Sequence, residues 1–247
     1  MTPNLLFKYK SFNKKNKRYI FDIIKRNRLY LANRKELNDP LEGIYTPIEL
    51  STCGVGICRS QEIEQFPVAE ERNRYRILSL SSTAFSPQMW GYYADSYRGV
   101  CFGFYNHGQF SDANEVIYAS PNKQVITNPD DLQNIIQNDY RYKHAGWIHE
   151  KEWRIIRRSD EKFISYLPED LACVIVDEER INAALYKRLK KRLPKNIPVL
   201  TIVAGCYSTR IRMLDVRCER LFDGSEPSFI DSDEDLFNYL IRSQNLV

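Results

Sequence analysis

The sequence predicts an α+β protein, with one mixed, mostly antiparallel sheet and flanking helices. Strand-length apolar stretches and helix-length amphipathic stretches are interspersed along the 247 residues, without the regular strand–helix period of a doubly wound sheet. The sequence shows no linker composition, internal repeat or low-complexity run that would divide it. We therefore expect residues 1–247 to fold as a single domain that closes with a helix near 233–243.

The N-terminal part carries four strand-like and two helix-like segments. Aromatic and β-branched residues with a period of two mark the strands, and Ser86 followed by Pro87 marks the start of the second helix. Asn38–Gly43 has the chemistry of a turn. The expected strands are 5–9, 29–32, 76–83 and 98–104, and the expected helices are 16–28 and 88–95. Residues 44–74 lack a clear period, which predicts a long irregular segment.

The C-terminal part continues with alternating elements. Asn128–Asp131 combines a cap residue, a proline and two acids, which is typical of a helix start. That helix is expected to lead to a strand that contains Glu150, and the apolar run Leu171–Val176 predicts a buried strand. The remaining expected elements are strands near 116–118, 198–203 and 211–216 and helices 177–193 and 233–242.

Charge and composition argue against several classes of protein. The formal net charge of +4 is too small for the field of a nucleic-acid coat protein. No apolar run approaches the roughly 20 residues of a membrane span, and the N-terminal segment lacks a signal-peptide core. The close cysteine pair Cys53 and Cys58 has neither CxxC spacing nor a second pair, so no metal site is expected from the cysteines. We expect a cytoplasmic protein with reduced thiols.

The most informative segment is Trp147–Ile156, in which Glu150, Glu152 and Arg154 stand at every second position. On an extended strand Glu150, Glu152 and Arg154 would point to one side of a sheet. Burying such a row without partners is costly, because each charge loses its hydration. The row is therefore solvated, paired within itself as a structural network, or part of the wall of a polar cleft.

Three segments in chain order resemble the site pattern of ADP-ribosyltransferases: a first strand with Lys8, a strand with Ser79 and Ser81, and a strand with Glu150 and Glu152. The resemblance implies a split sheet that binds NAD as co-substrate, with a first-strand cation on its phosphates and serines bracing the nicotinamide site. It also implies Glu152 as the catalytic residue and Glu150 as the residue that orients the acceptor. A carboxylate suits this chemistry because the departure of nicotinamide leaves positive charge on the ribose.

Longer motifs resemble a bacterial family called domain of unknown function 2971, over roughly residues 5–215. The motifs are Leu5–Lys10, Leu29–Ala32, Leu37–Glu42, Met89–Asp95, Arg98–Phe102 and Trp147–Ile156. This family name implies no activity. Its members often carry His where this sequence has Tyr92 and Tyr97, and ADP-ribosyltransferases carry Arg or His where it has Lys8.

These resemblances together predict a nucleotide cleft around the catalytic pair Glu152 and Glu150. The other expected members, none of them a metal ligand, are Lys8, Tyr9, Asn38, Asp39, Ser79, Ser81, Trp90 and Arg98. Plainer interpretations stay open: Asn38 and Asp39 as a turn, Trp90 as core, and Arg98 as the surface partner of Asp95.

The resulting hypothesis is an ADP-ribosyltransferase-like enzyme with a protein or nucleic-acid acceptor, and analogy alone suggests toxin action or phage defence as its setting. One alternative is a metal-dependent nuclease with Asp39, Glu42, Glu150 and Glu152 as magnesium ligands. Another is a non-enzymatic interaction module. The basic segment Tyr186–Lys195 is either a solvated helix face or a contact for nucleic-acid phosphates.

Overall fold

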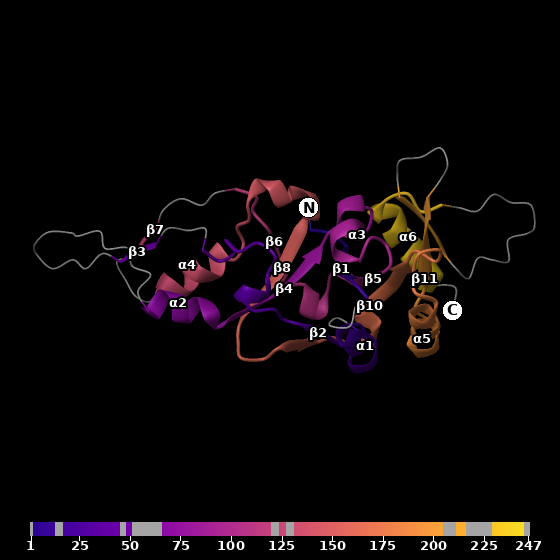
Figure 1. Cartoon of the computed structure of the whole chain (residues 1–247), viewed down its shortest axis with the longest axis horizontal. Coiled ribbons are helices and arrows are strands. Elements are labelled where there is room, and N and C mark those ends of the chain that lie inside the picture. The colour runs from indigo at the N-terminus through magenta and orange to yellow at the C-terminus, as the bar shows by residue number, and fades with distance from the viewer. Residues whose placement is uncertain are drawn as a thin grey trace, which may run out of the picture.

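One eight-stranded sheet runs through the middle of the molecule in the computed structural model (Figure 1). The structure describes residues 2–12, 17–44, 48–50, 66–119, 124–126, 131–204, 211–215 and 229–244. None of the helices in these ranges combines the length and the apolar character that a membrane crossing needs.

The strands of the large sheet are β1 (Leu5–Lys10), β4 (Tyr75–Ser81), β5 (Val100–Tyr105), β6 (Asn114–Glu115), β8 (Glu152–Arg158), β10 (Leu171–Val176), β11 (Val199–Ala204) and β12 (Ile211–Asp215). Two small sheets pair β2 (Arg28–Tyr30) with β9 (Phe163–Ser165) and β3 (Ile48–Leu50) with β7 (Gln124–Ile126). The α-helices are α1 (Lys17–Arg26), α2 (Phe66–Asn73), α3 (Pro87–Tyr93), α4 (Asp131–Asp139), α5 (Ala183–Arg192) and α6 (Asp233–Gln244). Short 3₁₀ helices are η1 (Arg34–Glu36), η2 (Gly108–Phe110), η3 (Ala145–Glu150) and η4 (Pro168–Asp170).

The large sheet has the strand order β12-β11-β10-β5-β1-β4-β8-β6. Its neighbours are antiparallel except for the parallel pair β10 and β11. The predicted α+β class with a mostly antiparallel mixed sheet is therefore confirmed.

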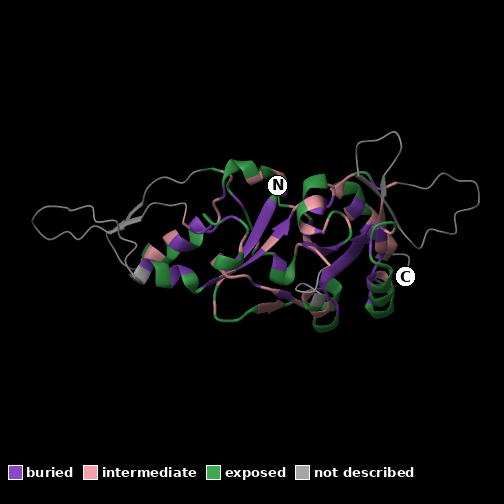
Figure 2. Cartoon of the chain, in the orientation of Figure 1, coloured by how far each residue is buried: buried purple, intermediate pink, exposed green. Residues whose placement is uncertain are grey.

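Alternating side chains give this sheet two apolar faces. Leu6 and Leu80 belong to one core cluster, to which α1 contributes Ile23 and α5 contributes Leu185. Phe7 belongs to the other cluster, with residues of α3 and α6. Helices α1 and α5 thus cover one face and α3 and α6 the other, as the arrangement in Figure 1 and the buried central strands in Figure 2 show.

A third, smaller core joins α2 and α4 to the ends of β4 and β8. Its members include Val68 of α2 and Tyr140, which follows α4. The prediction of an irregular segment over 44–74 is wrong for β3 and α2, because α2 is stabilised by packing on α4 and has only a weak apolar stripe of its own. Residues 51–65, with Cys53 and Cys58, lie outside the described residues.

The junction between β1 and β4 has the fewest paired residues in the large sheet. These strands share one register pair, Phe7 with Ser81, whereas Leu5–Lys10 pairs along its whole length with β5. Beyond the single pair, Lys8 Nζ donates a hydrogen bond to the Ser79 carbonyl oxygen at 2.5 Å. The eight strands form one sheet, but at this junction a lysine side chain replaces the backbone ladder.

Candidate functional site

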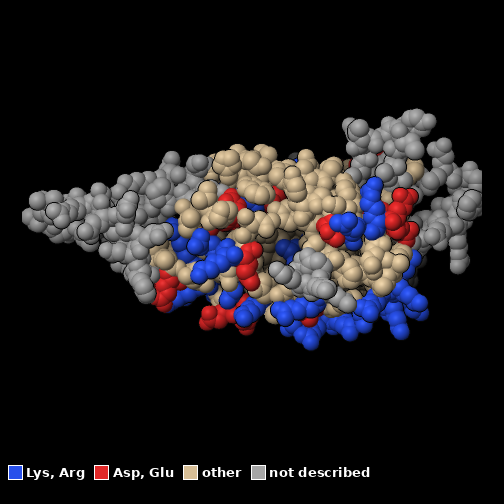
Figure 3. Space-filling model, in the orientation of Figure 1, with Lys and Arg blue, Asp and Glu red and all other residues tan. Residues whose placement is uncertain are grey.

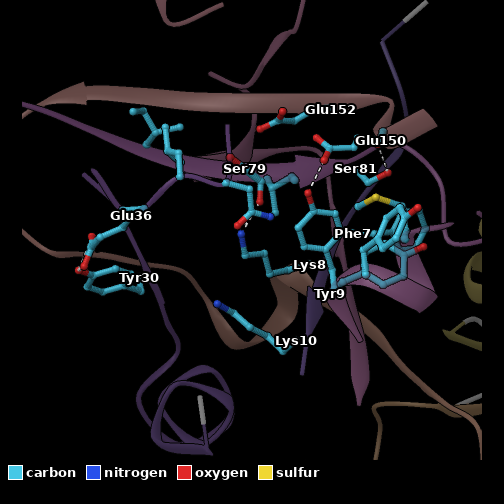
Figure 4. A pocket seen from close by; sticks show the side chains of 18 of the residues that line it. Phe7, Lys8, Tyr9, Lys10, Tyr30, Glu36, Ser79, Ser81, Glu150 and Glu152 are labelled. Atoms are coloured by element: carbon cyan, nitrogen blue, oxygen red, sulfur yellow. Dashed lines mark hydrogen bonds between the residues drawn. The ribbon is translucent and has the colours of Figure 1, made fainter. Parts of the chain in front are cut away.

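A cavity of about 470 Å³ lies at the junction of β1 and β4 (Figure 4). The four successive residues Phe7, Lys8, Tyr9 and Lys10 all line it. Because successive side chains of a strand point to opposite faces of its sheet, a cavity lined by all four lies at an open edge of the strand. Its volume falls within the range of about 300–1,000 Å³ that is usual for small-molecule sites.

Most of the predicted site residues meet in this cavity, although they come from four separate parts of the chain. Those that line it are Lys8, Tyr9, Asn38, Ser79, Ser81, Glu150 and Glu152. Figure 4 shows Lys8 beside Ser79, with Glu150 and Glu152 above Ser79 and Lys10 farther away, below Lys8. The three segments that resemble the ADP-ribosyltransferase pattern therefore converge in space.

Three predicted site residues do not line the cavity. Trp90 is fully buried, donates from Nε1 to the Ala84 carbonyl oxygen at 2.8 Å, and belongs to the core. Arg98 lies on the surface and pairs with Asp95 at 3.1 Å. Asp39 is buried in the turn, where its Oδ1 accepts from the Leu41 amide at 2.9 Å. For these residues the plainer interpretations describe the structure.

The expectation that Glu150, Glu152 and Arg154 share one strand needs a correction. Glu150 ends η3, and Lys151 adopts a left-handed conformation with φ 43° before β8 begins at Glu152. This residue breaks the strand because left-handed backbone cannot continue a β-ladder. Ser81 Oγ holds the end of η3 by donating to the Glu150 carbonyl oxygen at 2.7 Å, so the Glu150 carboxylate still reaches the cavity.

Arg154 is fully buried and forms the base of a charged cluster. Its Nε and Nη2 donate to the two carboxylate oxygens of Glu152 at 2.7 and 2.8 Å. Nη2 also contacts Glu42 at 2.7 Å, and Nη1 donates to the Tyr140 carbonyl oxygen at 2.7 Å. The structural-network interpretation therefore holds for Arg154, because each of its three guanidinium nitrogens has a described partner and the residue does not line the cavity.

Lys143 is a central member of the site that the sequence pattern did not single out. Its Nζ lies 2.5 Å from Glu150 Oε2, 2.9 Å from Glu152 Oε2 and 3.1 Å from Glu42 Oε1. The side chain is 4% exposed. Lys143 sits in the irregular connection between α4 and η3, where no periodicity predicts the direction of a side chain, so only tertiary structure identifies it.

Glu42 reaches this cluster because of the turn that precedes Gly43. Gly43 has φ +71°, and a Cβ at this position would lie 2.2 Å from Tyr140 Cε1. Only glycine fits a left-handed backbone pressed so closely against a ring. The turn thus has a structural role, which is to bring the buried Glu42 carboxylate to Lys143 and Arg154. We name the set Glu42, Lys143, Glu150, Glu152 and Arg154 the buried charge cluster.

Ionisation within the buried charge cluster follows from its pairing. Burial opposes the charged form of Glu152, but the charges of Arg154 and Lys143 outweigh it and hold the pKa of Glu152 below its usual range. Burial likewise opposes the charge of Lys143, but its three carboxylate neighbours raise its pKa. Burial raises the pKa of Glu42. The cluster contains three carboxylates and two cations.

Two lysines of β1 supply positive charge on the other side of the cavity. Burial, with a smaller contribution from Lys10, lowers the pKa of Lys8 to about 7, against the opposing effect of Glu152 and Glu150. Burial lowers the pKa of Lys10 to about 8. Both groups titrate near neutral pH, and an anion bound between them would favour their protonated forms.

Aromatic side chains complete the wall and rim. Tyr93 donates a short hydrogen bond to Glu150 Oε1. Tyr92, where the 2971 family often has His, is 70% exposed and lines the cavity. Tyr97, the second such position, stacks on Trp90 and lies away from the cavity. Only the replacement at Tyr92 therefore touches the site. Tyr19 and Tyr30 line the far end, with ring centroids 4.9 Å apart.

Residues 89–155 match the model of a family described as "Protein of unknown function (DUF2971)". The resemblance inferred from the sequence is thus confirmed over this segment, which contains Tyr92, Lys143, Glu150 and Glu152. No curated protein and no solved structure matches the chain. The resemblance to ADP-ribosyltransferases is not confirmed by these comparisons and stays a prediction.

Proposed function

Because the matched family carries no assigned activity, we propose a function from the cavity: it binds NAD, and the protein transfers ADP-ribose to an acceptor or to water. The proposal is carried by one observation. A cationic residue of β1, the serine strand β4 and two glutamates, far apart in sequence, line the same cavity at the opening of the sheet. This is the combination that the ADP-ribosyltransferase resemblance requires.

In the proposed reaction, the bond between ribose C1′ and the nicotinamide nitrogen breaks, and nicotinamide leaves with the bonding electrons. A new bond forms between C1′ and a nucleophilic atom of the acceptor or of water, which loses its proton to solvent. Positive charge develops on the ribose in between, so an ionised carboxylate nearby lowers the barrier. Glu152 suits this role because its pKa is held below the usual range.

The hydrogen bonds of the two glutamates support different roles for them. Both oxygens of Glu152 accept from Arg154, and one also accepts from Lys143. Each oxygen of Glu150 accepts one described hydrogen bond, from Tyr93 or Lys143. A carboxylate has about four lone-pair directions, so Glu150 retains more capacity to accept from a hydroxyl or an acceptor group. We assign charge stabilisation to Glu152 and orientation of the acceptor to Glu150.

The proposal assigns the NAD phosphates to Lys8 and Lys10, which line the cavity from β1 (Figure 4). An ammonium group is a point charge and does not form the two-pronged contact of a guanidinium. Two lysines at alternate positions of one strand offset this difference, because each can meet a separate phosphate oxygen. The mixed lining of lysines and tyrosines suits a ligand with both phosphates and aromatic rings.

The nuclease alternative has less support. Its proposed magnesium ligands include Glu42, Glu150 and Glu152, whose carboxylates are already held by Lys143 and Arg154. A magnesium ion would have to displace these cations, and the attraction between each cation and its carboxylate partners would be lost. Among the described residues, no group of His, Cys, Asp and Glu side chains has the arrangement of a metal site.

Nicotinamide release from NAD tests the proposal. Wild type is compared with Glu152→Gln, and with Glu161→Gln, which changes an exposed glutamate in the connection between β8 and β9. We expect release by wild type and Glu161→Gln, and a loss of about a hundredfold or more in Glu152→Gln. A cell lysate supplies acceptors.

The folding of each variant is measured beside its activity, because Glu152→Gln removes a partner of two buried cations. Lys8→Gln serves as a second variant outside the buried charge cluster, and we expect it to weaken NAD binding while the protein stays folded. If wild type releases no nicotinamide and NAD does not raise its melting temperature, the proposal is wrong.

A further inference from the structure

An exposed basic surface covers the side of the molecule formed by α1 and α5. Figure 3 shows Lys and Arg atoms gathered along the lower edge, where Figure 1 places these two helices. All six cations of α5 and its C-terminal extension are exposed. They are Lys187, Arg188, Lys190, Lys191, Arg192 and Lys195. Among them, only Lys190 has a described carboxylate partner, Glu178 at 3.9 Å.

Helix α1 extends this surface. Arg18, Phe21 and Lys25 follow one another at helical spacings of three and four, so they lie along one side of α1. The guanidinium carbon of Arg192 lies 4.7 Å from the centroid of the Phe21 ring, which joins α5 to this side of α1. We name the exposed cations of both helices the α1–α5 surface.

The α1–α5 surface reaches the rim of the cavity. Lys10 follows Leu6 and Lys8 at a period of two, on the sheet face that α1 and α5 cover. Its Nζ lies 5.7 Å from the centroid of the Tyr19 ring, and the Arg18 guanidinium carbon lies 4.8 Å from the same centroid. Tyr19 lines the far end of the cavity, so cations continue from α5 across α1 to that end.

We propose that the α1–α5 surface binds the phosphate backbone of a single-stranded nucleic acid, which is the acceptor of the ADP-ribose group. This step rests on the proposed function. Most of these exposed cations have no described acidic partner, so they complement a polyanion and release its counterions when they bind it. The paired rings of Tyr19 and Tyr30 at the end of the cavity offer a stacking surface for a base. A strand without a complement can present a base there at little cost in stacking energy.

Binding is tested without NAD, by fluorescence anisotropy of a labelled short oligothymidylate. The test variant Lys187→Gln/Arg188→Gln/Lys191→Gln removes three charges from α5. The control Arg74→Gln/Arg157→Gln/Lys162→Gln removes three charges that lie outside α1 and α5, after α2, in β8 and before β9. We expect the affinity of the test variant to fall about tenfold or more, and its salt dependence to weaken by about 0.7 in log–log slope for each lost phosphate contact. The control should bind like wild type.

Two results of the binding experiment would overturn the proposal. Equal losses in the two variants would show a response to net charge alone. Tighter binding to vesicles of anionic lipid, or to a polyglutamate peptide, than to the oligonucleotide would assign the surface to another partner.

A second readout separates this proposal from the proposed function. With labelled NAD and the oligonucleotide, the α5 variant should release nicotinamide at the wild-type rate in the absence of oligonucleotide but should lose transfer of label to it. Oligonucleotide that binds through α5 while NAD is consumed without labelling it would overturn its role as acceptor. If binding depends on α5 and no protein consumes NAD, the proposed function fails and the binding surface remains.

Discussion

The buried charge cluster and the α1–α5 surface differ in how their charged side chains are placed: those of the cluster are buried and paired, and those of the surface are exposed. In the cluster, Lys143 and Arg154 contact three carboxylates and are almost without solvent exposure. On the surface, the cations are exposed and most of them lack described acidic partners. A buried charge depends on its partners for stability, whereas an exposed charge is hydrated and free to meet a ligand. The same residue types therefore serve structure in one region and recognition in the other.

The largest effect is expected from Arg154→Met, which breaks the cluster at its base. The change leaves Glu42 and Glu152 buried with one cation fewer, and removing one member of a buried ion pair typically costs about 3–5 kcal/mol. Chemical denaturation should show this loss in the free energy of unfolding. Arg157→Met, on the same strand but half-buried and paired with the exposed Asp112, should cost about 1 kcal/mol or less. Similar costs for both would contradict the distinction between the two regions.

A smaller loss is expected from Gly43→Ala, which leaves every charge in place. The added Cβ meets the Tyr140 ring and must adopt φ +71°, so about 2 kcal/mol of strain is expected. The free energy of unfolding of Gly91→Ala, at a helical glycine with open space around it, is the control and should not decrease. A Gly43→Ala protein as stable as wild type would mean that another backbone conformation can bring the Glu42 carboxylate to the cluster.

The lysines of the cavity should make ligand affinity and stability respond to pH with opposite signs. The pKa of Lys8 is about 7 in the folded chain, and an unfolded lysine titrates near 10.4. Between these values the unfolded state binds more protons, so stability should rise with pH. Phosphate favours the protonated lysine, so affinity for ADP-ribose should fall by up to about tenfold per pH unit above 7. Calorimetric titrations of wild type and Lys8→Met would measure this, and an unchanged profile in Lys8→Met would exclude Lys8 as the phosphate partner.

The smallest effect on stability is expected from the three α5 substitutions Lys187→Gln, Arg188→Gln and Lys191→Gln. Exposed side chains without specific partners usually change the free energy of unfolding by about 0.5 kcal/mol or less each. The thermal melting temperature of the triple variant should therefore stay close to that of wild type. A large decrease would show that these cations stabilise the fold, and the α1–α5 surface would then resemble the buried charge cluster.

Features that depend on a single segment are predicted from the sequence more closely than features that depend on tertiary contacts. Strands with strong apolar patterns were predicted closely, and Leu171–Val176 has the observed bounds. The face shared by Glu152 and Arg154 was also predicted, because a period of two needs only the strand itself. The position of Glu150 on η3 was missed, since the left-handed Lys151 leaves no signal in the pattern.

The features that the sequence did not predict depend on tertiary contacts. Lys143 contacts Glu150 and Glu152, which are near it in the sequence, and Glu42, which lies about a hundred residues before it. Helix α2 has little apolar pattern of its own and is held by α4. Trp90 and Tyr92 lie two residues apart on one short helix, yet the first is core and the second lines the cavity. Which side of that helix faces the sheet becomes visible only in the fold.

The single register pair between β1 and β4 also bears on how the molecule opens. It divides the large sheet into a group from β12 to β1 and a group from β4 to β6, and the strands within each group are joined by longer ladders except at the short edge strand β6. Backbone hydrogen bonds that link such groups so sparsely contribute little to their cooperativity. We therefore expect the two groups to behave as separate units in hydrogen exchange, with Phe7 and Ser81 at their common boundary. The sheet can then open locally at the cavity while the strands on either side stay folded.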